Sequence, residues 1–207
     1  MIYLLIFIEA IIVSIIVKMY LYPIKSEESI SKWFSYLKFR ENPMILIDIF
    51  LVLTHVFLFK KYSFSISFFT YIALSSILLT VSIVDIRAKI IPDKVMILGI
   101  ALGTVIMFLN DNISFINALL GLVVCGGIIA IISTITKGAV GMGDAKLFAC
   151  IGLFLGLQNT LGVMVMATML SGLTGLILLT FKVANRKTTI PFAPFISAAA
   201  IFIMVFN

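Results

Sequence analysis

The chain has 207 residues, of which 62% are hydrophobic and only 12% are charged, and its mean hydropathy is +1.25. A soluble domain carries roughly 25% charged residues, so the composition excludes a soluble globular protein and indicates an integral membrane protein. The formal net charge is +6, and what it indicates depends on where the basic residues lie along the chain.

Apolar segments of membrane-spanning length, about 17 to 25 residues, predict an all-α polytopic bundle of about eight transmembrane helices in one domain, 1–207. The first segment lacks a basic leading region and a cleavage site, which favours a retained helix over a removed signal peptide. The sixth segment is short, and its boundary with the seventh, at Leu157–Gln158–Asn159, is weak. The expected helices in chain order are 2–22, 44–60, 65–85, 94–109, 115–136, 145–157, 160–181 and 190–206.

The basic residues gather on one side of the expected bundle. That side is made of the loops 23–43, 86–93, 137–144 and 182–189. The opposite side holds only Lys60 and Lys61. By the positive-inside rule, the basic side is cytoplasmic and both termini are non-cytoplasmic. The positive charge is therefore a topology signal, so we expect the lipid bilayer as a partner and no nucleic acid.

Two acids stand at the cytoplasmic ends of different apolar segments. Asp85 ends a long apolar run, and Asp144 begins another in "GAVGMGDAKLF". An ionisable group at this depth is costly and points to function. Two close carboxylates share a proton, so that one acts as base toward water and the other as acid toward a carbonyl, as in aspartyl proteases. From its own helix end, Asp85 is expected to favour protonation and Asp144 ionisation.

The residues around Asp144 suit an active-site loop. Gly141 and Gly143, on either side of Met142, are expected to take positive φ and to let a substrate backbone approach. Lys146 follows Asp144 by two positions, and a nearby cation would help to keep that acid ionised. The alternative interpretation is a glycine-rich turn with a capping aspartate, because G-x-G-D alone is a weak signal.

Several other residues have structural interpretations. Asp93 follows Pro92 and is expected to cap the next helix. Cys125 and Cys150 lack CxxC spacing, which indicates buried small side chains and no metal site. His55 is interpreted as a hydrogen-bonded bundle residue rather than a ligand. Four glycines in the last third of the chain are expected at close helix contacts: Gly152, Gly156, Gly172 and Gly175.

Three ordered motifs resemble those of the bacterial type IV prepilin peptidases, which are GxGD-class intramembrane aspartyl proteases. They are "VDIRAKIIPD" (84–93), "GMGDAKL" (141–147) and "IPFAPFI" (190–196). The resemblance implies that Asp85 and Asp144 are catalytic. It assigns supporting positions to Arg87, Lys89, Pro191, Phe192, Pro194, Phe195 and, at the start of the second helix, Asp48.

The resemblance also implies a substrate and a place of action. Members of this family cut the short basic leader from prepilins and pseudopilins, after a glycine, at the cytoplasmic face of a prokaryotic inner membrane. They need no metal or other cofactor for this hydrolysis. The expected partner is therefore a single-span pilin-like protein whose leader stays in the cytoplasm.

The sequence departs from the family in two places. Many members carry two CxxC pairs that bind zinc in the first cytoplasmic loop, and they also methylate the new amino terminus. Here a short loop, 23–43, has no cysteine, so we do not expect methyltransferase activity. Ala193 replaces the usual glycine between the two proline–phenylalanine elements, which is expected to stiffen that loop.

Other functions remain open from the sequence. A presenilin-like protease would share G-x-G-D, but its Tyr-Asp and Pro-Ala-Leu elements do not occur here. An archaeal preflagellin peptidase is a nearer relative. From a different class, Asp85 and Asp144 could serve as a proton or cation relay in a transporter. A non-catalytic assembly subunit would leave the pairing of the two acids unexplained.

Overall fold

The computed structural model of the chain describes residues 44–110, 112–136, 140–183, 185 and 188–207. The expected helix 2–22 with Glu9, and the expected loop 23–43, lie outside these residues. Internal contacts divide the chain into two units, Met1–Lys61 and Tyr62–Asn207. The first unit contributes helix α3 (Met44–Tyr62). The second unit holds both candidate catalytic aspartates.

The second unit is helical. Its elements are α4 (Ile66–Ala88), α5 (Asp93–Leu109), α6 (Phe115–Leu120), the π-helical turn η1 (Gly121–Cys125), α7 (Gly126–Ile135), α8 (Met142–Thr180) and α9 (Ala193–Phe206). The described part of the chain contains no strand, which confirms an all-helical architecture there. The expected count of about eight helices and the sidedness of the termini stay predictions.

Three of the described helical segments are long and apolar enough to cross a membrane: Ile66–Ala88, Phe115–Ile135 and Met142–Thr180. The second of them runs through α6, η1 and α7 without interruption, as the expected helix 115–136 required. Helix α9 is apolar but shorter. The expectation of an integral membrane protein therefore has a structural counterpart in these spans.

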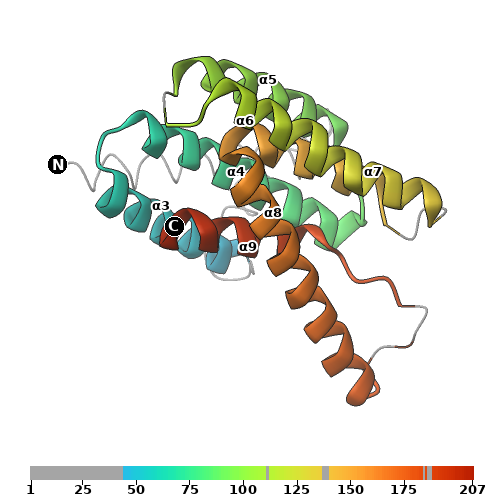
Figure 1. Cartoon of the computed structure of the whole chain (residues 1–207). Helices are drawn as coiled ribbons and strands as arrows, with labels where there is room; N and C mark the ends of the chain where they lie inside the picture. The colour runs from blue at the N-terminus through green and yellow to red at the C-terminus, as the bar shows by residue number, and fades with distance from the viewer. Residues whose placement is uncertain (1–43, 111, 137–139, 184, 186–187) are drawn as a thin grey trace, which may run out of the picture. The chain divides into compact units, whose positions relative to one another are not determined.

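Helix α8 is the centre of the second unit, because it contacts every other helix of that unit. Figure 1 shows its first part (orange) among α4, α6 and α7. The closest approach joins Gly152 of α8 to Gly121 of η1, where a Cβ built on Gly152 would overlap the Gly121 backbone. Small residues allow helix backbones to meet in membranes, and this contact confirms the expectation for Gly152.

Helix α8 breaks at Gly156, where φ is 74° and ψ is 176°. Such a conformation is open to glycine and strained for other residues. Side chains satisfy the backbone groups that the break exposes: Asn117 Oδ1 accepts the Leu157 N–H at 3.0 Å, and Thr160 Oγ1 donates to the Gly156 carbonyl at 2.6 Å. The two helices expected at 145–157 and 160–181 thus divide one residue before the predicted boundary.

Beyond the break, α8 first packs against α9, and its last part then extends away from the other helices of its unit (Figure 1). Among the described residues, a Cβ on Gly172 would meet nothing within 4 Å, and one on Gly175 only the Ile190 side chain at 3.9 Å. The expectation that these two glycines mark close helix contacts was therefore wrong within this part of the chain. Their spacing resembled a packing motif, but their half of α8 has few neighbours.

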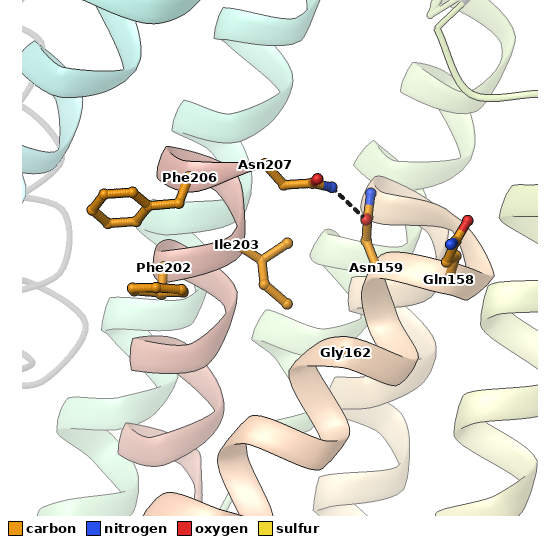
Figure 2. Close-up of a pocket in the computed structure, with 7 residues that line it drawn as sticks. All are labelled: Gln158, Asn159, Gly162, Phe202, Ile203, Phe206 and Asn207. Carbon is orange, nitrogen blue, oxygen red and sulfur yellow. Dashed lines mark hydrogen bonds between the residues drawn. The ribbon is translucent and has the colours of Figure 1, made fainter.

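A pocket of about 320 Å³ lies between the middle of α8 and the end of α9. In Figure 2, Asn207 reaches from α9 toward Asn159 on α8, and their side chains are hydrogen-bonded at 2.8 Å. The other lining residues are Gln158, Gly162, Phe202, Ile203 and Phe206. Because its α9 residues lie 9 to 14 positions after Ala193 and a helix rises about 1.5 Å per residue, this pocket lies about 14–21 Å along α9 from its start.

Candidate active site

The end of α4 presents Asp85. The helix ends in a left-handed turn at Lys89, where φ is 54°, and the Lys89 N–H donates to the Asp85 carbonyl at 2.8 Å. This turn reverses the chain, so that Ile91 and Asp93 lead directly into α5. The Asp85 residue is only 7% exposed. A carboxylate buried to this degree needs hydrogen-bond donors close by.

The start of α8 presents Asp144. Gly141 is the N-cap residue, and its N–H donates to Asp144 Oδ2 at 3.2 Å. The segment before it is anchored by the buried Ser133 of α7, whose hydroxyl donates to the Val140 carbonyl at 2.8 Å. The acid therefore closes its own helix cap. The expectation of positive φ was wrong for Gly141, whose φ is −69°, and in the described residues Gly156 is the glycine with positive φ.

Gly143 has a packing role that the sequence did not suggest. A Cβ built on it would lie 2.8 Å from the Cβ of Ile91, in the turn that follows α4. Real Cβ contacts of that length do not occur, so the missing side chain lets the start of α8 pack directly on this turn. Gly143 thereby brings the segment that carries Asp144 close to the one that carries Asp85.

The start of α9 completes the arrangement. The Ala193 N–H, at the first position of α9, donates to Asp85 Oδ2 at 2.9 Å. Pro194 follows within the first turn, where a helix does not need the missing N–H. Phe192 packs against Phe148 of α8, with ring centroids 6.3 Å apart. The three sequence motifs therefore meet at one end of the second unit.

Asp144 lies within electrostatic reach of Asp85. Each also accepts a backbone N–H at the N-terminal end of a helix, α8 for Asp144 and α9 for Asp85. The expected difference in protonation considered only the helix that carries each acid. The N-terminal end of α9 beside Asp85 opposes the effect of the C-terminal end of α4, so the expected order of protonation stays a prediction.

Lys146 has a different partner from the expected one. Its ammonium group pairs with Asp93 at 2.5 Å, and the two side chains are 46% and 68% exposed. Asp93 is the first residue of α5, and Pro92 is the N-cap residue without a side-chain cap. The expectation that Asp93 caps α5 was wrong, and the action of Lys146 on Asp144 stays a prediction. The pair instead links the starts of α5 and α8.

Most of the other residues predicted for the site lie at the end of the second unit that holds the two aspartates, and one lies in the first unit. Arg87 and Met142 are exposed there. Lys89 is exposed too, and its Nζ donates to Thr189 Oγ1 at 2.8 Å, which ties the end of α4 to the segment before α9. Pro191 and Phe195 flank the start of α9 and are partly buried. Asp48 belongs to α3 in the first unit, and its side chain lies outside the described residues.

Sequence reasoning missed two buried serines near Asp85. The hydroxyl oxygens of Ser82 on α4 and Ser197 on α9 lie 2.6 Å apart. Serine is common in membrane helices and carries no charge, so no signal singled these two out. In the parts of the chain that the structure covers, no group of three His, Cys, Asp or Glu residues is arranged to hold a metal ion.

Comparison with known proteins agrees with the three motifs. Residues 72–205 match the model of the type IV leader peptidase family. The chain is 30% identical over 148 residues to a prepilin leader peptidase/N-methyltransferase of Bacillus subtilis, which covers 71% of this chain and 59% of that protein. Proteins of the same name from Xanthomonas campestris and Pseudomonas putida are 28% and 24% identical, over 67% and 74% of this chain.

The chain spans only 59%, 50% and 55% of the length of these three relatives. No solved structure matches it significantly. The family match includes Asp85, Asp144 and the start of α9, and it extends over well more than half of the chain. The chain belongs to the type IV leader peptidase family.

Proposed function

We propose that this chain is an aspartyl endopeptidase that removes the basic leader peptide from type IV prepilins or pseudopilins at the cytoplasmic face of the membrane. The observation that supports the proposal is that the end of α4, with Asp85, and the start of α8, with Asp144, pack together through Ile91 and Gly143, which brings the two acids within electrostatic reach. The names of the relatives supply the substrate class.

The chemistry follows from two acidic groups that share one proton. The ionised carboxylate takes a proton from a water molecule, whose oxygen attacks the carbonyl carbon of the scissile peptide bond. The protonated carboxyl group gives its proton to the carbonyl oxygen, and the tetrahedral intermediate then collapses as the amine leaves with a proton. Because the two groups titrate together, the roles belong to the pair rather than to either residue.

The backbone contacts give the pair its geometry. Ala193 N–H holds Asp85 Oδ2, and Gly141 N–H holds Asp144 Oδ2. Each carboxyl group therefore keeps its second oxygen for water or substrate. Fixed donors of this kind cost no reorganisation when the reaction proceeds.

We further propose that the chain acts as a peptidase without the N-methyltransferase activity named for its relatives. The support is chemical: the loop 23–43 contains no cysteine, so it cannot supply the thiolate ligands of a structural zinc site. The basic residues Arg87 and Lys89 lie at the end of α4 that carries Asp85, which by the positive-inside rule faces the cytoplasm.

The test is co-expression with a prepilin that carries a basic leader, followed by mass spectrometry of the pilin amino terminus. Asp85→Asn and Asp144→Asn should each abolish processing, because the one carboxyl group left beside an amide cannot act as both base and acid. Asp93→Asn is the matched control, since it removes a surface carboxylate outside the pair, and it should process normally. The same spectra report methylation, which we expect to be absent.

Retained processing in either Asp85→Asn or Asp144→Asn would refute the aspartyl mechanism. A proton or cation relay makes a different prediction, because it would carry charge across vesicles and tolerate Asp→Glu in part. Proton flux measured in proteoliposomes with the same variants separates the two functions.

A further inference from the structure

We propose that Ser82 and Ser197 are positioning residues for Asp85. Their hydrogen-bonded hydroxyl groups fix the rotation of α9 about its axis and its position along α4, so that the Ala193 N–H meets the Asp85 carboxylate. This inference rests on the proposed function, because it assigns a role to two residues in the same proteolytic site.

The spacing of the four residues carries the argument. Ser82 lies three residues before Asp85 on α4, and Ser197 lies four residues after Ala193 on α9. Residues three or four apart share one face of a helix. The Ser82–Ser197 contact, with oxygens 2.6 Å apart, therefore lies one helical turn from the Ala193–Asp85 contact on the same interface. Two contacts on adjacent turns fix both the rotation and the sliding of α9.

The serine pair is part of a buried network rather than an isolated contact. Ser82 and Ser197 are 6% and 3% exposed. Ser197 Oγ lies 3.0 Å from the Leu78 carbonyl of α4, and Ser82 Oγ lies 3.3 Å from the Ala193 carbonyl of α9. Each hydroxyl therefore reaches a backbone group of the opposite helix. Ala193 donates its N–H to Asp85, and its carbonyl is one of the acceptors, with the Leu78 carbonyl and Ser197 Oγ, that lie within reach of the single Ser82 hydroxyl proton.

Three other hydroxyl groups of α4 bond only within their own helix. Thr70, Ser76 and Thr80 donate to carbonyls of α4 itself, four residues earlier. Such bonds stay within one helix and do not orient a neighbour. Ser82 also has an acceptor in its own helix, at Leu78, but its oxygen lies beside α9 as well. Apolar packing alone can hold α9 against α4, whereas directional hydrogen bonds select one register.

The experiment uses the purified full chain with a prepilin substrate and compares Ser82→Ala, Ser197→Ala and the double variant with Thr70→Ala. Thr70 is a buried α4 residue whose bond stays within its helix, so its variant controls for the loss of a buried hydroxyl. Each serine variant should lower kcat roughly tenfold while KM changes by less than about twofold, because displacing a reacting group costs turnover more than binding.

Two further readouts separate positioning from folding. The acidic limb of the pH–rate profile should move to higher pH in the serine variants, since a weaker N–H contact favours the ionised carboxylate less. A smaller folded fraction would lower the rate without moving this limb. The double variant should lose no more than about twice as much as the worse single variant, because both serines act through one shared contact.

Wild-type kcat and pH profile in the serine variants would overturn the proposal, and so would a lower rate with an unmoved profile or strictly additive losses. A failure of the proposed function would look different. In that case the wild-type chain would leave the prepilin uncut, or Asp85→Asn and Asp144→Asn would still cut it.

Discussion

The backbone N–H of Ala193 donates a hydrogen bond to Asp85 Oδ2 across 108 residues of sequence. The contact involves no side-chain atom of Ala193, so any residue other than proline can supply it. What the position does restrict is size, because Ala193 is fully buried. The alanine that departs from the family's glycine therefore keeps the contact.

A pair of substitutions at this position tests the contact. Ala193→Gly should keep cleavage within about twofold of wild type, since the N–H and the space both remain. Ala193→Leu should lower kcat at least tenfold, because overpacking a filled site costs about 1–3 kcal/mol and would push the start of α9 from Asp85. Cleavage rates of folded protein in detergent measure both. Equal activity of the two variants would contradict a tightly fitted helix start.

Gly143 should tolerate no side chain. Gly143→Ala would place a methyl group 2.8 Å from the Ile91 Cβ, and the shift needed to relieve it would move the adjacent Asp144. We expect a fall in kcat of roughly tenfold or more, because small displacements of reacting groups are costly. Gly127→Ala is the control, since a Cβ there meets no described atom within 4 Å, and its rate should match wild type. A fully active Gly143→Ala would show that the turn at Ile91 can shift without displacing Asp144.

Two glycines of α8 should differ sharply in their effect on stability. Gly152→Ala forces a methyl group into the Gly121 backbone, whereas the methyl group of Gly172→Ala would meet no described atom within 4 Å. Overpacking of about 1–3 kcal/mol should lower the thermal midpoint of Gly152→Ala by roughly 5–10 °C. Gly172→Ala should melt within about 2 °C of wild type. Thermal unfolding of both variants is measured in the same detergent, with the loss of monodisperse protein as the readout. A similar midpoint for both would argue against the close α8–η1 contact.

Lys146→Gln should have a small effect. The exposed pair with Asp93 is of the kind that contributes about 0–1 kcal/mol, so cleavage should fall by no more than about threefold, a loss that high salt should reproduce in the wild-type chain. A loss of a hundredfold would instead support the original interpretation, in which Lys146 acts on Asp144. Initial rates at low and high salt, with Asp93→Asn in parallel, decide between them.

The sequence predicted the parts of the site that depend on residue type and depth. The apolar runs predicted α4, α5 and the α6–α7 segment, and their ends placed Asp85 and Asp144 at comparable depth. A change in hydropathy is visible along the chain, so these elements could be read from it. The family resemblance, which the comparisons confirm, drew on the same residues.

What the sequence could not supply were the partners that arise when helices pack. Lys146 is two residues from Asp144 in sequence, but along a helix such neighbours point in different directions, and its ammonium meets Asp93 instead. The donor for Asp85 comes from a backbone amide, which every residue except proline carries. No pattern of side chains reveals such a contact before the fold is known.

The break at Gly156 uncouples the two halves of α8, so that the direction of side chains in one half does not set their direction in the other. In a continuous α-helix each residue turns by about 100°, so the face that carries Asp144 would fix the orientation of every later side chain. The backbone of Gly156, with φ of 74° and ψ of 176°, interrupts that relation. The residues after it can keep their own periodicity, so a one-residue insertion at this link could be absorbed without the 100° rotation of the distal half that it would impose within a continuous helix.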